Sequence, residues 1–434
     1  MNLRTFFLFT SASLVALFLT AQAQRAPHDP LTLDQCIALS LQNNPQLLSS
    51  QYTVAESEER VREMRAAYFP TLSLTSVATR YSSASGKSSG ETFTSNNYNA
   101  GLSARYYLFQ GFKTVAATDA ALFNYDASTY QHESNRQDLI LKITQAYYKL
   151  VQAERLIRVA EKSVERARLH RDVANARVKA GVATRSDVLK AEVELSNEGL
   201  TLIQAKNGRL TAQGSLNILL GRPAGSPILI VDDLGTLERN AVQQFDSLVA
   251  VAFQHRPELK RFDSQILAQR SNIQYARSDY FPSISLDANY SYGGAEVAAL
   301  DNIWSVGLTV SIPLFTGFST SARVTQEEMA LRSLQEQRDA LRQQISLDVW
   351  NAYSALKEAE ERIDNTKTFM ENAQENMNIA EGEYKEGIGS MIDVTDAQTA
   401  LLTAEQSHIE ALADFKIAVA SLERSLGTRD TQEK

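Results

Sequence analysis

The strongest constraint in this sequence is an apolar repeat of period seven that runs from Leu139 to Val178. Apolar or small residues recur there in alternating steps of four and three, and Arg171 interrupts the series. The members are Leu139, Ile143, Ala146, Leu150, Ala153, Ile157, Ala160, Val164, Ala167, Ala174 and Val178. A repeat sustained this long specifies a supercoiled helix whose stripe faces a neighbouring helix. The many alanines predict close approach of the two backbones.

The same repeat returns 206 residues later. Its members there are Ile345, Val349, Ala352, Leu356, Ala359, Ile363, Thr366, Met370, Ala373, Met377, Ala380 and Tyr384. A Tyr-Phe-Pro motif also recurs, at Tyr68–Pro70 and Tyr280–Pro282, and a Leu-Phe-x-Gly-Phe motif recurs at Leu108–Phe112 and Leu314–Phe318. The chain is therefore predicted to contain two similar halves.

The N-terminal residues 1–23 are predicted to be a secretory signal peptide, because Arg4 precedes an apolar run and small residues end at Ala23. That run is about fourteen residues, shorter than the roughly 20 that a membrane-spanning helix needs. The chain has 434 residues and a formal charge of −8. It shows no excess of basic residues, so nucleic acid is not an expected partner. Its single cysteine, Cys36, excludes an intrachain disulfide and is interpreted as a buried small residue.

Proline, glycine and periodicity divide the chain into elements. The first repeat is predicted at residues 24–221, with a helix at 32–66 that is interrupted at Asn43–Pro45, strands at 71–81 and 97–109, and helices at 113–180 and 184–220. A connector follows at 222–244. The second repeat is predicted at 245–427, with a helix at 245–278, strands at 283–292 and 303–313, and helices at 318–386 and 390–426, before a tail at 428–434. Each of the longest helices would measure about 100 Å.

The four strands alternate apolar residues with small or polar residues, most clearly in Trp304–Ile312. Such strands fit a membrane barrel with lipid outside and water inside, although a half-buried soluble sandwich shows the same alternation. Four strands cannot close a barrel in lipid, because open edges would leave backbone groups unpaired. Several chains must then share one barrel, and the helical hairpins below it would form a cylinder.

The order, spacing and tandem duplication of these motifs resemble the TolC-like outer-membrane channels of drug efflux and type I secretion, over residues 31–427. The resemblance implies a mixed α and β fold in which a homotrimer forms a twelve-stranded β-barrel continuous with a periplasmic α-helical barrel. It also implies an outer-membrane location in a Gram-negative-type cell, a passive duct without cofactor, and a periplasmic adaptor joined to an inner-membrane pump. The helical tips would contact that adaptor.

The two predicted tips carry the candidate site residues. Each has a glycine, Gly181 or Gly387, followed by a capping box of Thr184 with Asp187 or Ser390 with Asp393. Capping alone could account for both aspartates. Asp396 differs, because its counterpart in the first repeat is Lys190. The tip residues expected to meet the adaptor are Gly181, Thr184, Arg185, Ser186, Gly387, Gly389 and Ser390.

In the resembled family, an aspartate pair three residues apart lines the narrow pore entrance, and Asp393 and Asp396 match it. The family's closed state also uses a tyrosine hydrogen-bonded to an aspartate of the first tip, which Tyr384 and Asp187 match. A further family link uses an arginine where this chain has Gly389. The resemblance therefore predicts a gate at Asp187, Tyr384, Asp393 and Asp396. Because the arginine link is absent at Gly389, the closed state is expected to be held differently or less firmly than in the family.

Other functions are weighed against this interpretation. The five histidines show no metal-ligand spacing and are expected at the surface: His28, His132, His170, His255 and His408. Met370 and Met377 lie on the apolar seam and are read as packing residues, with a metal-efflux role left open. A periplasmic coiled-coil adaptor would lack four amphipathic strands, and an outer-membrane barrel enzyme would need a nucleophile and base that the sequence does not suggest.

Overall fold

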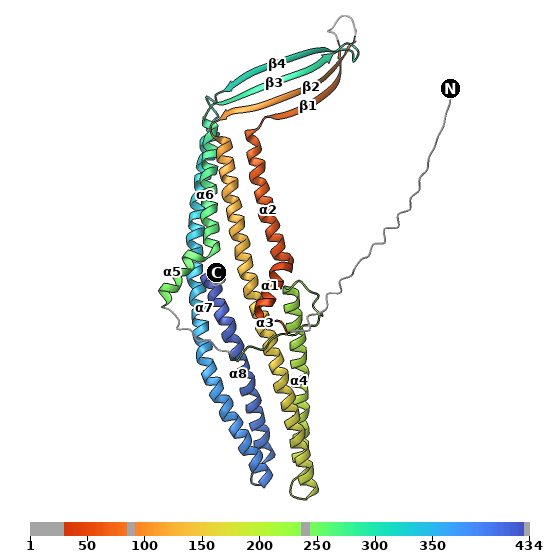
Figure 1. Ribbon diagram of the computed structural model, residues 1–434, viewed down its shortest axis with the longest axis vertical. Coiled ribbons are helices and arrows are strands. Elements are labelled where there is room, and N and C mark those ends of the chain that lie inside the picture. Colours follow the sequence, from red (N-terminus) through yellow and green to blue (C-terminus); the bar gives the residue numbers. More distant parts are fainter. Residues whose placement is uncertain (1–29, 85–91, 236–243, 429–434) are drawn as a thin grey trace, which may run out of the picture.

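The computed structural model describes residues 30–84, 92–235 and 244–428. The molecule is long, with a sheet at one end and two helical tips at the other (Figure 1). Two helices, α3 and α7, run from the sheet to the tips, while shorter helices lie beside their upper or lower halves. The predicted signal peptide at 1–23 lies outside the described residues.

The first repeat follows the predicted order of elements. It contains α1 (Leu33–Asn43), α2 (Pro45–Arg65), β1 (Thr71–Ala84), β2 (Thr92–Gln110), α3 (Lys113–Lys179) and α4 (Arg185–Leu219). The second repeat contains α5 (Phe245–His255), α6 (Pro257–Arg277), β3 (Ser283–Gly294), β4 (Asp301–Ser311), α7 (Ser319–Glu386) and α8 (Met391–Leu426). A short 3₁₀ turn precedes each hairpin, at Ala66–Tyr68 and Ser278–Tyr280.

Several boundaries differ from the sequence-based expectation, including β4, which begins and ends two residues earlier than predicted. The single helix expected at 245–278 is two helices, because Pro257 lacks an N–H and holds Arg256 in an extended conformation. The first hairpin is longer than expected, since the ladder continues through polar pairs such as Ser82 with Thr94. Backbone groups pair there after the apolar alternation has ended.

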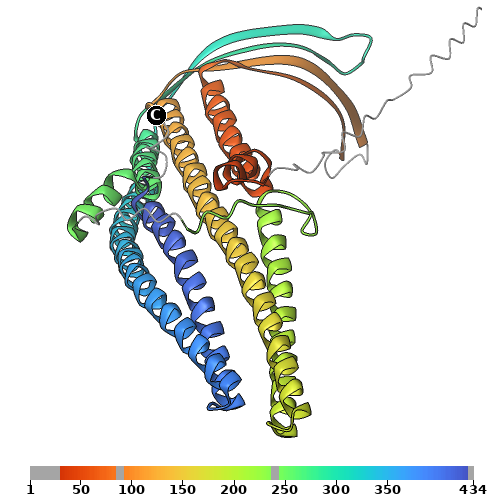
Figure 2. The same ribbon diagram turned by 60° about the horizontal axis from the view of Figure 1, so that its bottom comes forward.

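The four strands form one antiparallel sheet in the order β1-β2-β3-β4. The central pair, β2 with β3, joins the two repeats, for example through Leu102 opposite Tyr290. Figure 2 shows the sheet as a curved arch above the helices. Within the described residues, β1 and β4 each pair along one edge only, so the sheet has two open edges.

The strands turn into α3 and α7 through a Gly-Phe pair with left-handed backbone. The φ angles are 60° at Gly111, 65° at Phe112, 60° at Gly317 and 62° at Phe318. A Cβ at Gly111 would come within 2.6 Å of a backbone oxygen, so the turn requires glycine there. Both phenylalanines are exposed, and each ring lies edge-on to the phenylalanine three residues earlier.

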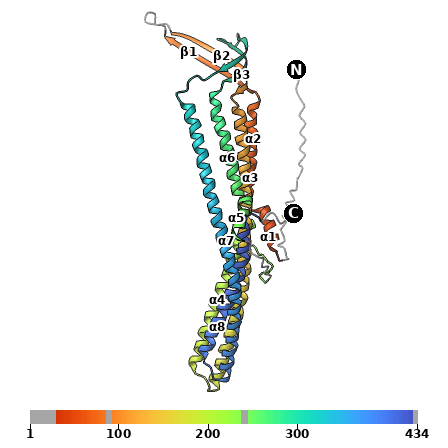
Figure 3. The same ribbon diagram turned by 90° about the vertical axis from the view of Figure 1, so that its left-hand side faces the viewer.

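The heptad seams are the core of the helical part. Ile143, Leu150 and Ala167 of α3 and Ile345 and Val349 of α7 are fully buried. Near the sheet α3 packs against α2 and α6, and nearer the tips it packs against α4 and α8. Seen from the side, the helices overlap in the lower half, and α7 stands apart from α6 and α2 toward the sheet (Figure 3). Among the described residues, no helix is long and apolar enough to span a bilayer.

The partners of the long helices α3 and α7 change at mid-height, where similar joints occur in the two repeats. In the first, Asn44 Nδ2 donates to the Leu219 carbonyl at 3.0 Å, at the end of α4. In the second, Arg256 Nε donates to the Ser425 carbonyl at 2.8 Å, near the end of α8. These carbonyls are among those that a helix C-terminus leaves unpaired, so the joints satisfy them. Gly221 lies just after the end of α4 and has a φ of 72°. A Cβ at this position would lie 2.6 Å from the backbone oxygen of Asn43, so the first joint requires glycine there.

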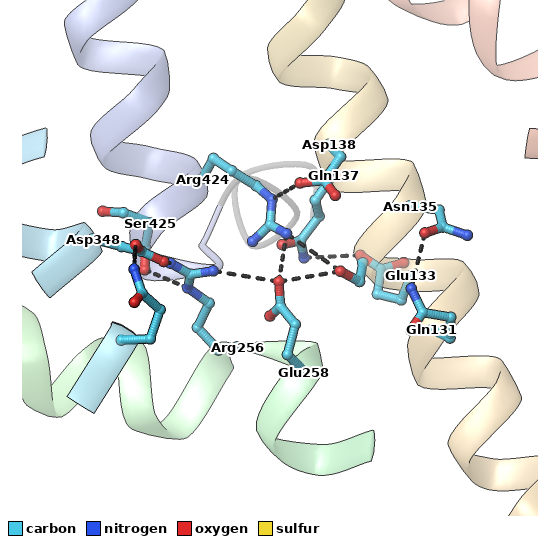
Figure 4. Close-up of polar contacts among 12 residues, drawn as sticks. Gln131, Glu133, Asn135, Gln137, Asp138, Arg256, Glu258, Asp348, Arg424 and Ser425 are labelled. Atoms are coloured by element: carbon cyan, nitrogen blue, oxygen red, sulfur yellow. Dashed lines mark hydrogen bonds and ion pairs between the residues drawn. The ribbon is translucent and has the colours of Figure 1, made fainter. Parts of the chain in front are cut away.

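A buried charge network holds the second joint (Figure 4). Glu258 Oε1 accepts from Arg424 Nη2 at 2.5 Å and from Arg256 Nη1 at 3.3 Å. Arg256 also pairs with Asp348 of α7 at 3.0 Å, and Arg424 pairs with Asp138 of α3 at 2.7 Å. The network therefore ties α3, α6, α7 and α8 together at one level.

Burial opposes ionisation of Glu258, but the charge and hydrogen bond of Arg424 and the charge of Arg256 outweigh it, and the pKa of Glu258 is lowered. A carboxylate with a lowered pKa stabilises the fold above its ordinary pKa of 4.5, and this stabilisation is lost as the pH falls through the lowered value. The joint is therefore expected to weaken in acid.

We expect Glu258→Gln to destabilise the protein by about 1.5–3 kcal/mol at neutral pH, because two buried guanidinium groups lose a shared charged acceptor and keep only Asp348 and Asp138 as carboxylate partners. Chemical denaturation followed by circular dichroism measures the change. Glu63→Gln is the matched control, since its pair with Arg60 is exposed and contributes about 0–1 kcal/mol. Equal stability of the two variants would contradict this role for Glu258.

Candidate functional site at the helical tips

The two tips lie at the end of the molecule farthest from the sheet (Figure 1). The first turn joins α3 to α4 through Gly181, and the second joins α7 to α8 through Gly387. Both glycines have the left-handed conformation that commonly ends a helix, with φ of 77° and 83°. Each turn therefore reverses the chain over a few residues, and the second helix of each pair returns alongside the first.

Capping boxes begin α4 and α8, as the sequence predicts. Asp187 Oδ2 accepts from the N–H and hydroxyl of Thr184, both at 3.0 Å. Asp393 Oδ2 accepts from the hydroxyl of Ser390 at 2.7 Å and its N–H at 2.9 Å. The Ser390 hydrogen bonds lower the pKa of Asp393. Helix capping accounts for the hydrogen bonds of these two aspartates.

Asp393 and Asp396 are both exposed and lie one turn apart on the same side of α8. Lys190, which occupies the matching position of α4, is exposed as well. The two tips therefore present different charges, with two carboxylates on α8 and one carboxylate and one ammonium on α4.

The residues expected to meet an adaptor are accessible to different degrees. Exposed are Gly181, Thr184, Arg185, Ser186, Gly387 and Ser390, and Gly389 is partly buried. A Cβ at Gly389 would lie 2.9 Å from the Cβ of Glu383 and 3.2 Å from backbone. Any side chain at residue 389 would therefore require a small shift between the turn and the last turn of α7.

Tyr384 is buried, with 6% of its surface exposed, in an apolar cluster that includes Met391 and Val394. Its hydroxyl has no hydrogen-bond partner among the described residues. The hydrogen bond to Asp187 that the resemblance implies is therefore not formed in this structure. Burial and the charge of Asp187 raise the pKa of Tyr384, while Arg177 opposes the shift.

Arg177 of α3 provides a link between the hairpins that sequence reasoning missed. Its Nη1 donates to the carbonyls of Tyr384 and Lys385, at 2.5 and 3.0 Å. Its guanidinium carbon lies 5.0 Å from the centre of the Tyr384 ring. These carbonyls belong to the last turn of α7, where the helix dipole favours a cation, and the Tyr384 carbonyl also accepts from the Gly387 N–H at 3.2 Å.

The expectation that the histidines lie at the surface is wrong for His170. This side chain is 6% exposed, and its two ring nitrogens face Glu194 and Glu381. His132, His255 and His408 are partly buried, and His28 lies outside the described residues. In the part of the chain that is described, no group of three or more His, Cys, Asp or Glu is placed to hold a metal ion.

The chain is similar to known outer-membrane proteins along most of its length. The model of the family described as outer membrane efflux protein matches residues 36–222 and 248–428. Protein CyaE of Bordetella pertussis is 24% identical over 403 residues, which cover 92% of this chain and 84% of that protein. The probable efflux pump outer membrane protein TtgC of Pseudomonas putida is 27% identical over 411 residues, with 92% and 83% covered.

A solved structure of a membrane protein from Pseudomonas aeruginosa has the same fold. Its TM-score is 0.80 at 23% identity, and the match covers 91% of this chain and 93% of that chain. Similarity along almost the whole length includes both the sheet and the helical tips. These matches favour the channel interpretation over the adaptor and the barrel enzyme.

We expect Arg177→Ala to loosen the last turn of α7, because two carbonyls lose a charged donor. Hydrogen–deuterium exchange of amides 381–387 should accelerate about tenfold or more, since hydrogen bonds to charged groups contribute about 1.5–3 kcal/mol. Arg171→Ala is the control, because Arg171 pairs with its neighbour Asp172. Unchanged exchange at 381–387 would exclude Arg177 as a link between the hairpins.

Proposed function

Because the chain belongs to the outer membrane efflux protein family, we propose that three copies form a passive exit duct of a tripartite efflux pump or type I secretion system, gated at the helical tips. The observation that supports assembly is that the four-stranded sheet, whose apolar strands suit contact with lipid, has two open edges among the described residues. Each unpaired N–H or C=O costs several kcal/mol in the hydrocarbon region, so β1 of one copy must pair with β4 of the next. Three copies then supply twelve strands.

The surface of β4 supports this assembly. All of its residues are exposed, including the alternating apolar series Trp304, Val306, Leu308 and Val310, which shares one face of the strand. A row of large apolar side chains on one face of a strand is suited to lipid tails. The polar row on the other face of β4, Ser305 to Ser311, would line the water-filled interior.

The lower helices support the same assembly. Exposed apolar residues recur along α4 in the four-three spacing of a second seam: Leu189, Val193, Leu200, Ile203 and Leu210. Within one chain α4 packs mainly against α3, which leaves this stripe uncovered. A helix from a second copy would bury it and close the helical wall.

The tips would then form the periplasmic entrance. We propose that the exposed turns, led by Arg185, Ser186 and Ser390, contact a periplasmic adaptor that joins the duct to an inner-membrane pump. The relatives support this arrangement, because TtgC is described as part of an efflux pump. The duct itself would bind no cofactor, and the pump would provide the energy.

Asp393 and Asp396 would narrow and charge this entrance. Three copies supply six carboxylates around one constriction, which attract cations. Tyr384 and Asp187 would contribute to the closed state through burial of the ring and the position of the first tip, and Arg177 would hold the last turn of α7.

Removing this charge tests the acidic entrance. Asp393→Asn combined with Asp396→Asn should lower the cation-to-anion permeability ratio of the channel severalfold in planar bilayers and weaken block by divalent cations. Asparagine retains an oxygen for the cap, so α8 should remain folded. Glu386→Gln, in the exposed last turn of α7, is the control. Wild-type selectivity in the double variant would remove these aspartates from the constriction.

A separate experiment tests the assembly. Leu200→Glu with Ile203→Glu places two charges in the proposed seam between copies, so the fraction of trimer in detergent should fall by about tenfold or more. Sedimentation velocity measures it. Gln254→Glu, which adds a charge at an exposed position of α5 away from this stripe, should leave the trimer intact. A fully trimeric double variant would contradict the proposed contact of α4.

A further inference from the structure

Above the tips, four helices meet at one polar cluster that the proposed gate does not use. His170 of α3 lies between two carboxylates, with Nδ1 at 3.2 Å from Glu194 of α4 and Nε2 at 3.3 Å from Glu381 of α7. The other oxygen of Glu194 accepts from the Thr395 hydroxyl of α8 at 3.4 Å. The imidazole ring therefore connects one helical hairpin to the other.

The number of protons on the ring decides whether both contacts exist. A neutral imidazole has one N–H donor, and its other nitrogen is an acceptor. Both carboxylates are already acceptors, since Glu194 binds Thr395 and Glu381 binds Lys385 at 3.3 Å. Two contacts to two carboxylates therefore require the imidazolium form. A neutral ring keeps one hydrogen bond and turns a lone pair toward the second carboxylate.

We propose that His170, Glu194 and Glu381 form a proton-dependent clamp that holds the two hairpins together above the tips. With the ring protonated, α3 is tied to both α4 and α7. Loss of one proton breaks one of the two ties and places an acceptor against a buried carboxylate. The inference rests on the proposed gate for its consequence, because a looser tip matters only if the tip closes the duct.

The surroundings set the direction of the response. Burial disfavours the charged ring, but the hydrogen bonds and charges of Glu194 and Glu381 outweigh it and raise the pKa of His170 above its ordinary 6.5. The clamp is therefore complete at acidic pH and weakens as the pH rises through the raised value. Lowering the pH across this range closes the clamp.

Other charged groups lie around the cluster on every packed helix. Glu198 follows Glu194 by one turn of α4, and its pKa is raised by burial and by the charge of Glu194. Arg166 of α3 pairs with Glu405 of α8 at 3.3 Å, and Lys385 of α7 pairs with Glu381. Protonation of Glu198 at low pH would remove a negative charge near the clamp without supplying the missing N–H donor.

The test measures the distance between the hairpins at two pH values. Spin labels at Val182 and Ile388, both highly exposed turn residues, report the separation of the tips by pulsed electron resonance. Cys36 is fully buried and is replaced by alanine to avoid labelling. The full chain is used in detergent, with labelled copies diluted into unlabelled copies. In the wild type, the distribution of distances between the two labels should be narrow at about pH 5.5. At about pH 8.5 the fraction of long distances should be about tenfold larger.

Two variants should abolish the response in opposite ways. His170→Gln removes the titrating ring, so its distance distribution should be broad at both pH values. The distance distribution of Glu381→Gln should be narrow at both pH values, because the glutamine amide can donate to Nε2 of a neutral His170 ring. His408→Gln is the control, since His408 contacts the Thr366 hydroxyl and should leave the response unchanged.

A wild-type distribution that is the same at both pH values, or a response that persists in both clamp variants, would overturn the proposal. Conductance of the same proteins in planar bilayers separates the clamp from the gate. A pH-dependent distance without a pH-dependent conductance would support the clamp and remove the tip from the proposed gating function.

Discussion

The apolar seams of α3 and α7 are the constraint on which the rest of the structure depends. Each seam occupies the lower part of a helix of more than sixty residues, and that helix needs neighbours over a length that no single partner helix provides. The chain meets this need with upper partners, α2 and α6, and lower partners, α4 and α8. Where the partners change, helix ends meet at mid-height, and the contacts of Asn44 and Arg256 satisfy their carbonyls. The charge network of Glu258 follows from that geometry.

Duplication explained much of what could be predicted. A motif found twice gives each assignment a second, independent observation, and the order of helices and strands follows from it. The two proline joints show what was lost when this logic was not applied: the break at Pro45 was recognised, whereas Pro257, at the matching place, was included in one continuous helix. Strand ends were missed for a different reason, because backbone pairing of Ser82 and Thr94 has no apolar signature.

The candidate site was predictable only where it depends on local sequence. Capping boxes at Thr184 and Ser390 involve residues three apart, so their spacing reveals them. Arg177 contacts carbonyls more than two hundred residues away, and His170 lies between helices from both repeats. No periodicity identifies such partners, because each residue occupies an ordinary position on its own helix. His170 was therefore misassigned to the surface.

The tip also shows how one departure from a family pattern can change the neighbouring contacts. With glycine at 389, the turn approaches the last turn of α7 so closely that a Cβ would meet Glu383. Residue 389 therefore contributes no charge to the turn, while Arg177 reaches the same helix end from α3 and binds its carbonyls. The positive charge that joins the hairpins is thus on the first repeat rather than the second. Since Arg177 binds backbone oxygens, this link does not require the hydroxyl of Tyr384, which is consistent with that hydroxyl having no partner among the described residues.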